Sequence, residues 1–450
     1  MRQKAFLIVA SGLAASVMLA GCASELGLAP SSSKIDAIVV GDEPYAVNAG
    51  AAIMAGGGNA VDAVTAMYFA LSVTYPVAAG LGGGGICLVH DSIAHRQEEF
   101  DFLARDSRSG GTYAVPGNVR GFAALQSTFG KLPWQRVIAS SEQYASTGFP
   151  ISQALATRLA AAENVIRLDA GLAEEFMDES GHVKAAGSVV ANRDLAETLA
   201  EIRTRGADAL YAGPISSRIA AYVAAQGGAL TAAEIQAYQP ERGSPRKIEF
   251  GTQSVFVPGS GTGAGAFAGA LFENILRAPS SVAETSNTEG AVVAATKQTL
   301  SRFGVANLPN DLGSTGFAAT DGTGQAVACA VTMNGPFGSG HTAQGTGVTL
   351  ALAPSTSQAG LAAAFLTPVI ATNGGENISF AGTGAGGPVG TASIADALMR
   401  LAKGEVVTRR GAPRTGTALY DTVNAILCQS GGCAALIDAG ANGLGAVPGR

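Results

Sequence analysis

Short apolar runs alternate with alanine-rich stretches along most of the chain. Runs typical of β-strands occur at AIVVGD, ICLVH, KIEF and SVFVP. Residues 46–75 and 155–167 instead have the spacing and composition of helices. This mixture indicates an α/β or a layered α+β architecture and disfavours a propeller or a helical bundle.

The last third of the chain predicts a β-hairpin. The segments GFAATD and QAVACAVTM lie on either side of Gly322, Thr323 and Gly324, which is a turn sequence typical of a hairpin. Helical character stops near Asn307, just before this pair. No internal repeat is found, so the pattern does not predict a solenoid.

Composition and charge narrow the possible partners. The 450 residues include 61 glycines, and 47% are hydrophobic while only 14% are charged, so the chain can bury a core and is not of the disordered type. The length fits up to three domains or one large layered domain. A net charge of −6 and the lack of a basic stripe with aromatic residues give no basis for binding nucleic acid.

The first 22 residues predict where in the cell the protein is located. Arg2 and Lys4 precede an apolar run at residues 5–20, which is followed by Leu-Ala-Gly and Cys22. This pattern is typical of a secretory signal, and its end resembles the bacterial lipobox, in which the cysteine is lipidated. The alternative is an ordinary signal peptide with a chance cysteine. We predict a signal peptide at residues 1–21 and a lipidated tether at residues 22–36. The protein is expected to face the periplasm, and Ala23 favours anchoring to the outer membrane.

In the predicted oxidising compartment, the remaining four cysteines could form disulfides. Cys428 and Cys433 enclose only four residues, so we predict a disulfide between them, the alternative being two free thiols on a surface turn. Cys87 and Cys329 lie within apolar runs and are expected to be buried thiols that are not bonded to each other. No cysteine or histidine spacing resembles a zinc site, so we predict neither a metal nor a cofactor.

Two glycine-rich segments have the spacing of nucleotide-binding loops, at residues 382–387 and from Gly259. In a chain so rich in glycine such matches are weak, because a dinucleotide site also needs a strand, a helix and an acidic residue in one unit. No G-x-S-x-G segment is present, so an ordinary Ser-His-Asp hydrolase is not predicted.

Several motifs in fixed order resemble the γ-glutamyltranspeptidase family. They are EPYAVNAGAAIMAGGGNAVDAV, AVPGNVRGFAALQSTFGKLPW, GFPIS, LYAG, GGALTAAEIQAYQP, STGFAATDGTGQAVACAVTMNG and GTGAGG, and they extend from about Gly41 to Pro448. The resemblance implies an α+β fold of the N-terminal nucleophile hydrolase type, a four-layer αββα sandwich. It also implies a precursor that cuts itself into a large subunit, residues 37–313, and a small subunit, residues 314–450, which remain paired.

The resemblance also implies the site. The family's nucleophile falls on Ser314, which is serine where the family has threonine, and the hydroxyl that hydrogen-bonds it falls on Thr332. Asn334 corresponds to a residue that holds the substrate amino group, while Gly386 and Gly387 correspond to the oxyanion hole. Two alternatives are Thr315 as nucleophile in a shifted register, and a Ser-Thr pair that only opens a strand.

Other family positions differ in this chain. Leu103 stands where the family has the arginine that binds the γ-glutamyl carboxylate, and Arg105 follows two positions later as a possible substitute. The head-group ligands of the family fall on residues 351–356 and on Ala364 and Phe365. Three hypotheses remain: a γ-glutamyltransferase or glutathione hydrolase, an acylase of the same fold for less polar amides, and a non-enzymatic envelope lipoprotein.

Overall fold

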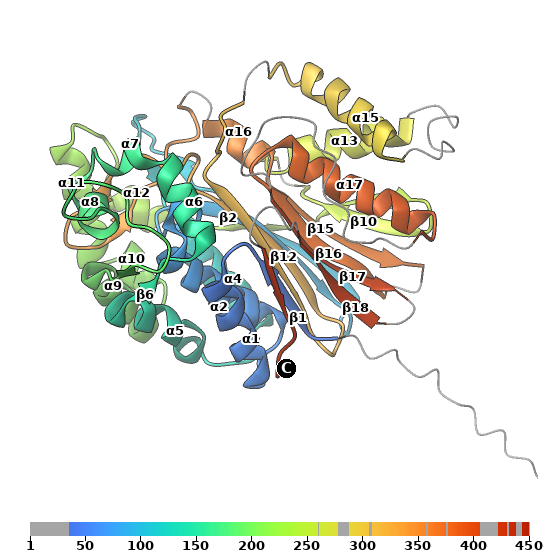
Figure 1. The fold of residues 1–450 in the computed structure, drawn as a ribbon, viewed down its shortest axis with the longest axis horizontal. Helices are drawn as coiled ribbons and strands as arrows, with labels where there is room; N and C mark the ends of the chain where they lie inside the picture. The colour runs from blue at the N-terminus through green and yellow to red at the C-terminus, as the bar shows by residue number, and fades with distance from the viewer. Residues whose placement is uncertain are drawn as a thin grey trace, which may run out of the picture. The chain divides into compact units, whose positions relative to one another are not determined.

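Two β-sheets stacked face to face form the centre of the protein (Figure 1). The seven-stranded sheet has the order β19 (Leu444–Ala446), β1 (Ile38–Gly41), β11 (Ser314–Thr320), β12 (Ala326–Thr332), β2 (Gly84–Asp91), β3 (Arg96–Asp101) and β8 (Glu241–Gly243). The six-stranded sheet has the order β18 (Gly432–Ile437), β17 (Thr422–Gln429), β16 (Ile378–Ala385), β15 (Thr367–Asn373), β10 (Gln253–Val257) and β9 (Arg246–Phe250).

This computed structural model describes residues 36–259, 261–277, 288–305, 308–356, 359–374, 377–405, 422–429, 432–437 and 443–449. The predicted signal peptide, the predicted lipidation site at Cys22 and nearly all of the predicted tether lie outside these residues. Within the described part of the chain, no helix is both long and apolar enough to cross a membrane.

Helices cover the outer face of each sheet. On the seven-stranded sheet lie α1 (Pro44–Ala55), α2 (Ala60–Thr74), α3 (Pro76–Ala79), α4 (Asn118–Phe129) and α5 (Trp134–Thr147), and beyond them α6 (Gln153–Ala161), α7 (Glu163–Ile166), α8 (Ala170–Phe176), α9 (Arg193–Arg205), α10 (Asp208–Tyr211), α11 (Pro214–Ala225) and α12 (Ala232–Ala237). The six-stranded sheet carries α13 (Ala266–Arg277), α15 (Thr288–Arg302) and α17 (Pro388–Ala402), with α16 (Ala359–Ala364) near its end. The predicted αββα sandwich is confirmed.

Three short ladders complete the fold. They pair β4 (Arg105–Asp106) with β5 (Ala114–Val115), β6 (Phe149–Pro150) with β7 (Val189–Val190), and β13 (Thr342–Ala343) with β14 (Val348–Thr349).

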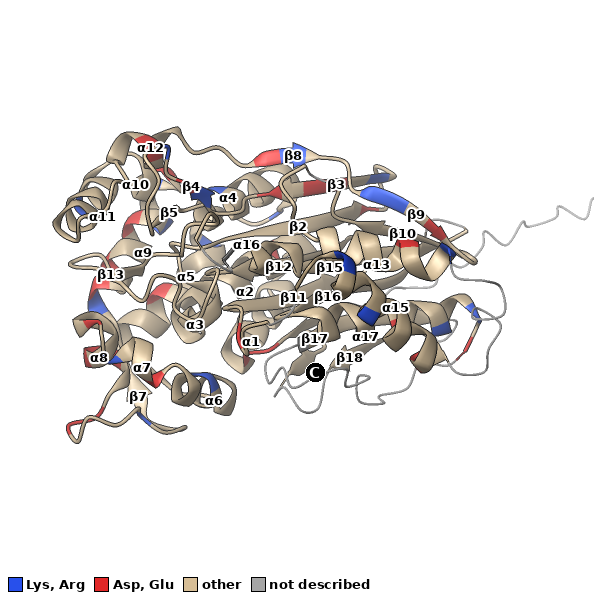
Figure 2. Cartoon of the chain, turned by 90° about the horizontal axis from the view of Figure 1, so that it is seen from above, with Lys and Arg blue, Asp and Glu red and all other residues tan. Residues whose placement is uncertain are grey.

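The central strands are apolar on both faces because both faces are covered. Every residue of β11 and β12 is buried, whereas β9, at the edge of its sheet, alternates between exposed and buried positions near its end. Charged side chains lie on the outer helices and edge strands, and the stacked strands carry few of them (Figure 2). The two sheets therefore meet over an apolar interior into which only selected polar groups enter.

Most predicted elements are present. The four β-runs became β1, β2, β9 and β10, and the hairpin became β11 and β12. The single helical stretch predicted for residues 46–75 is two helices, because Gly57 has φ of 92° and Asn59 starts a new helix with a capping box to Asp62. The helix α17 was not predicted.

The structure contains two disulfides. Cys428 is bonded to Cys433 across the β17–β18 pair, as the sequence suggested. The prediction that Cys87 and Cys329 are not bonded is wrong, because they form the second disulfide. The register of β2 and β12 sets these two residues directly opposite each other, with their Cα atoms 4.1 Å apart. Their separation of 242 residues hid this proximity in the sequence.

Candidate active site

Ser314 is the first residue of β11 and is almost fully buried. Its cross-strand neighbour in β12 is Thr332, so both side chains lie on the same face of the sheet. The Ser314 Oγ lies 2.9 Å from the Thr332 Oγ1 and donates a hydrogen bond to it. The predicted pair of hydroxyls is therefore assembled at the start of the central hairpin.

This face of β11 points toward the other sheet. Gly316 shares the face with Ser314, and a Cβ added to Gly316 would lie 2.4 Å from the side chain of Thr383 in β16. Thr315 points to the opposite face, where its Oγ1 donates to an Asp42 carboxylate oxygen at 2.6 Å. The geometry thus favours Ser314 over Thr315 as the residue that faces the space between the sheets.

The peptide bond before Ser314 is held in a fixed geometry. The carbonyl oxygen of Gly313 accepts hydrogen bonds from the Met333 backbone N–H at 2.8 Å and from the Thr332 Oγ1 at 3.2 Å. Gly313 has φ of 62°, and a Cβ there would lie 2.0 Å from the carbonyl oxygen of Gly335, so only glycine fits. Two donors therefore already act on the carbonyl that Ser314 would attack during self-cleavage.

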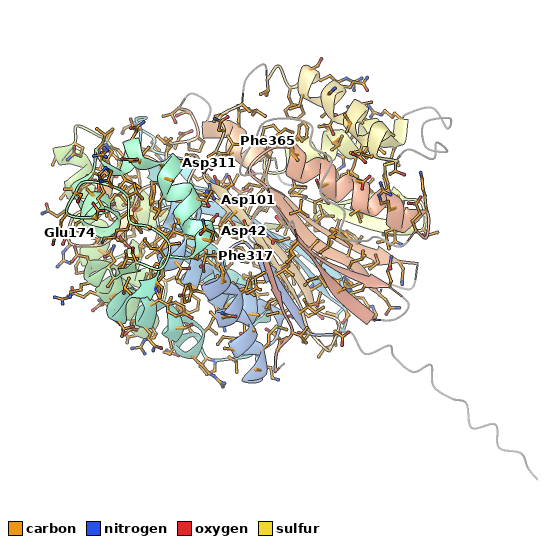
Figure 3. All side chains as sticks on the ribbon, in the orientation of Figure 1. Asp42, Asp101, Glu174, Asp311, Phe317 and Phe365 are labelled. Atoms are coloured by element: carbon orange, nitrogen blue, oxygen red, sulfur yellow. A yellow bond between two sulfur atoms is a disulfide. The ribbon has the colours of Figure 1, made fainter. Side chains whose placement is uncertain are left out.

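An ion pair that the sequence did not reveal lies next to this bond. Arg158 of α6 is buried and forms two hydrogen bonds with the carboxylate of Asp311, one of them 2.9 Å long between its Nε and the Asp311 Oδ2. Burial disfavours the charged guanidinium, but the charge of Asp311 and its hydrogen bonds, with a smaller contribution from Tyr75, outweigh this effect and raise the pKa of Arg158. Figure 3 labels Asp311 and Asp42 near the centre of the molecule.

Three other predicted site residues follow the ends of β12 and β16. Asn334 donates its backbone N–H to the Thr332 Oγ1 at 2.9 Å and its side-chain amide to the Leu352 carbonyl at 2.8 Å. Gly386 and Gly387 follow the end of β16 and lead into α17. Because Thr383 of the same strand packs against Gly316, the end of β16 lies over the first part of β11.

Glu43 is a buried carboxyl group next to Asp42. It accepts hydrogen bonds from the Ala46 N–H at 3.0 Å and from the Thr74 hydroxyl at 2.7 Å. Burial outweighs these bonds and raises the pKa of Glu43 to about 7.

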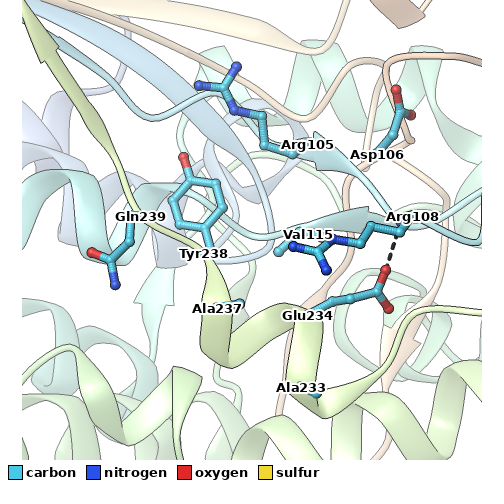
Figure 4. Close-up of a pocket in the computed structure, with 9 residues that line it drawn as sticks. All are labelled: Arg105, Asp106, Arg108, Val115, Ala233, Glu234, Ala237, Tyr238 and Gln239. Atoms are coloured by element: carbon cyan, nitrogen blue, oxygen red, sulfur yellow. Dashed lines mark hydrogen bonds between the residues drawn. The ribbon is translucent and has the colours of Figure 1, made fainter.

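Arg105 belongs to a separate pocket of about 280 Å³ (Figure 4). Its guanidinium is 3.3 Å from an Asp101 carboxylate oxygen and 2.9 Å from one of Glu241. The pocket is lined by Arg105, Asp106, Arg108, Val115, Ala233, Glu234, Ala237, Tyr238 and Gln239. Ser314 is not part of this lining, and both contacts of Arg105 are with carboxylates of the protein itself.

Apolar side chains occupy most of the positions where the family's head-group ligands fall, whereas Ser355 donates its hydroxyl to an Asp106 carboxylate oxygen at 2.7 Å. Leu103 is buried in a cluster with Ile86, Ala330 and Leu366, and Ala353 is also buried. Phe365 is fully buried and packs on Phe267, with 4.8 Å between the ring centroids. These side chains are therefore packed in the apolar interior, and none of them is charged.

Comparison with known proteins assigns the family. The family model described as gamma-glutamyltranspeptidase matches residues 46–284, more than half of the chain. The chain belongs to the gamma-glutamyltranspeptidase family. The matched residues end before Ser314, so the family model does not cover the Ser314 site of this gamma-glutamyltranspeptidase family member.

Curated relatives include hydrolases and an acylase. Glutathione hydrolase 2 of Arabidopsis thaliana is 29% identical over 215 residues, which are 44% of this chain and 37% of the relative. The glutathione hydrolase proenzyme of Bacillus subtilis is 28% identical over 225 residues, 45% of this chain and 38% of the relative. Acylase ACY 1 proenzyme of a Pseudomonas species is 30% identical over 243 residues, 47% of this chain and 43% of the relative. Each match thus spans less than half of the relative's length.

Solved structures share the fold of this family member. The cephalosporin acylase of Bacillus halodurans superposes with a TM-score of 0.74 at 18% identity, covering 92% of this chain and 96% of the acylase. The gamma-glutamyltranspeptidase of Helicobacter pylori gives a TM-score of 0.53 at 24% identity, covering 58% of this chain and 81% of that one. These likenesses establish the sandwich architecture.

Proposed function

We propose that this protein is a self-processing amide hydrolase of the γ-glutamyltransferase class with Ser314 as its nucleophile. The observation that carries the proposal is the hydrogen bond of 2.9 Å between the Ser314 and Thr332 hydroxyls, next to the doubly hydrogen-bonded carbonyl of Gly313. A hydroxyl in contact with an activating partner and beside a polarised carbonyl is the arrangement that acyl transfer needs.

The proposed chemistry has two stages. In the precursor, the Ser314 hydroxyl attacks the Gly313 carbonyl, and cleavage leaves Ser314 as a new N-terminus. Its α-amine then serves as general base for the adjacent hydroxyl, so that no histidine is required. The Ser314 oxygen attacks a substrate amide, the amine leaves, and water releases the acyl group. Gly386 and Gly387 are proposed to donate backbone N–H groups to the oxyanion, and Asn334 to bind the substrate.

Substitution of Ser314 tests the proposal. Ser314→Ala should remain a single uncut chain and should not release nitroaniline from a γ-glutamyl or acyl nitroanilide. Ser314→Thr is the matched control, because it keeps the hydroxyl and should still cut itself. A Ser314→Ala protein that cleaves at the wild-type rate would contradict the assignment.

An acylase acting on less polar amides is the second candidate. The observation that favours it is the apolar packing of Leu103 and Phe365 where the family's charged head-group ligands fall. A site without ion-pairing partners gains little from a free amino acid head group, so uncharged acyl groups are the better substrates. Arg105 could favour the glutamyl substrate only if it left its contacts with Asp101 and Glu241.

The location of the protein is a separate part of the proposal. Its support is the sequence around Cys22, where a signal peptide ends in a lipobox-like segment. We propose that Cys22 carries lipid and holds the protein on a periplasm-facing membrane, with the outer membrane as the expected site. Cys22→Ala should abolish labelling by a palmitate analogue and release the protein from membranes, and wild-type protein found wholly in the soluble fraction would contradict this.

A further inference from the structure

Asp311 and Arg158 hold the chain on both sides of the bond that Ser314 is proposed to cut. On the upstream side, the Asp311 Oδ1 accepts the backbone N–H of Gly313 at 2.7 Å. On the downstream side, the Arg158 Nη1 donates to the carbonyl oxygen of Ser314 at 3.1 Å. The ion pair between Arg158 and Asp311 joins these two contacts into one unit.

The surroundings make this unit rigid. The Arg158 side chain is 3% exposed and that of Asp311 is 8% exposed, and the Arg158 guanidinium lies 5.2 Å from the centre of the Tyr75 ring. A buried, bidentate arginine–carboxylate pair keeps its geometry because breaking it would leave a charge unpaired in the interior. Leu312, between Asp311 and Gly313, is itself buried in an apolar cluster.

We propose that Arg158 and Asp311 are positioning residues for self-cleavage. This rests on the proposed function of Ser314 and adds to it. The pair fixes the Gly313 and Ser314 peptide groups so that the Gly313 carbonyl carbon faces the Ser314 Oγ, while the Met333 N–H and Thr332 hydroxyl bind the carbonyl oxygen.

Self-cleavage at the Gly313–Ser314 bond needs no reagent other than water. The bond between the Ser314 Oγ and the Gly313 carbonyl carbon forms, and the bond from that carbon to the Ser314 nitrogen breaks. The Ser314 hydroxyl proton ends on the departing nitrogen, which becomes the new α-amine, while the Thr332 hydroxyl binds the Gly313 oxygen. Water then hydrolyses the ester, which leaves a Gly313 carboxylate and restores the Ser314 hydroxyl.

The test measures cleavage by intact mass over time and turnover of an acyl nitroanilide by the cleaved protein. Asp311→Asn keeps an acceptor for the Gly313 N–H but loses the ion pair, and we expect cleavage at least about 10-fold slower. Arg158→Lys keeps the charge but not the forked geometry, and should also slow cleavage. Arg167→Gln is the control, because its exposed pair with Glu163 does not touch the segment.

The outcomes separate this inference from the proposed function. For Asp311→Asn, the rate of cleavage should fall more than the turnover per cleaved molecule, because the Gly313 N–H that Asp311 holds belongs to the fragment that cleavage detaches from Ser314. If both variants cut themselves at the wild-type rate, or if slow cleavage comes with equally reduced turnover and melting temperature, the positioning role is wrong. If wild type never cuts, or if Ser314→Ala still does, the proposed function fails instead.

The Cys87–Cys329 disulfide leads to a second inference. The Cys87–Cys329 disulfide joins β2 to β12, and these strands lie on opposite sides of the proposed cut in the sequence. Both cysteines are fully buried, and Cys329 is three residues before Thr332. We infer that the large and small subunits of the processed protein remain covalently linked by this bond, which also keeps the strand of Thr332 next to β2.

Denaturing mass spectrometry with and without a reductant tests the link. Unreduced, cleaved protein should give one species with the summed mass of both fragments, and reduction should separate them. Cys87→Ser with Cys329→Ser should give two fragments without reduction. Separate fragments from unreduced wild type would overturn the inference. If the chain is uncut, a reductant-sensitive peptide pair containing Cys87 and Cys329 in a digest would support the bond, and free thiols there would refute it.

Discussion

The surroundings of Ser314 and the region around Leu103 and Phe365 differ in chemistry although they lie in one fold. Around Ser314, buried hydroxyls, backbone donors and an arginine–carboxylate pair satisfy one another at distances of 2.7 to 3.3 Å. Around Leu103 and Phe365, the buried contacts are aliphatic and aromatic. Groups that would carry out bond cleavage are present, whereas the family's charged recognition groups are absent from the matched positions.

This difference indicates that chemistry and recognition can change separately on the same scaffold. The nucleophile region depends on the hairpin register and on turns that admit few residue types, so substitutions there would break the geometry. The recognition region is apolar packing, which tolerates replacement when volume is kept. We therefore expect altered substrate choice with an unchanged cleavage apparatus.

Gly313→Ala should have the largest effect of the substitutions near Ser314. The new Cβ would collide with the Gly335 carbonyl, and φ of 62° disfavours alanine. We expect self-cleavage to stop and the free energy of unfolding to fall by about 3 kcal/mol or more. Gly304→Ala is the control, since φ is 67° there with open space around it, and should cost only about 1 to 2 kcal/mol by chemical denaturation.

Thr332→Val removes the hydroxyl between Ser314 and Gly313 without changing the shape of the side chain. The loss of a donor to the developing oxyanion should slow cleavage about 100-fold, measured by intact mass over time. Thr332→Ser restores the hydroxyl and should recover most of the rate. Equal rates for the valine and serine variants would show that this hydroxyl is not used.

Substrate preference tests the role of the apolar region around Leu103 and Phe365. We expect kcat/KM for an uncharged acyl nitroanilide to exceed that for the γ-glutamyl nitroanilide at least about 30-fold, because the γ-glutamyl head group finds no charged partner at the matched positions. Hydrolysis should also exceed transfer to an added dipeptide. Efficient turnover of glutathione that is abolished by Arg105→Ala would defeat this prediction and restore γ-glutamyl specificity.

Glu43→Gln should have the smallest effect on activity, and its effect on stability depends on pH. In the folded protein the pKa of Glu43 is about 7, above its ordinary value of 4.5, so folding takes up a proton between these values. Wild-type stability from this group therefore falls as pH rises from about 4.5 to 7. The glutamine variant should match wild type near pH 4 and be more stable by about 3 kcal/mol at pH 8, because a shift of one pKa unit corresponds to about 1.4 kcal/mol. A difference that does not grow with pH would contradict this.

Much of the central architecture followed from sequence. The β-runs and the hairpin turn were visible because strand periodicity and glycine turns are local signals. Resemblance to the family placed Ser314 and Thr332 together, and their cross-strand pairing agrees with that placement. The break between α1 and α2 was missed although three consecutive glycines and Asn59 mark it, because the alanine-rich sequence on both sides was read as one helix.

The missed features depend on contacts that are distant in sequence. Arg158 has no local signal in the alanine-rich α6, and its partners Asp311 and Ser314 lie more than 150 residues away. Cys87 and Cys329 each sit in a run that predicts a buried strand, but their bond follows from the β2–β12 register. Burial of Leu103 likewise required knowing that Ala330 and Leu366 pack on it.

The mass of the wild-type chain under denaturing, reducing conditions tests the central claim most directly. We expect two fragments whose boundary lies between Gly313 and Ser314, with serine as the first residue of the smaller one. A single uncut chain after prolonged incubation, or a boundary at another bond, would contradict it.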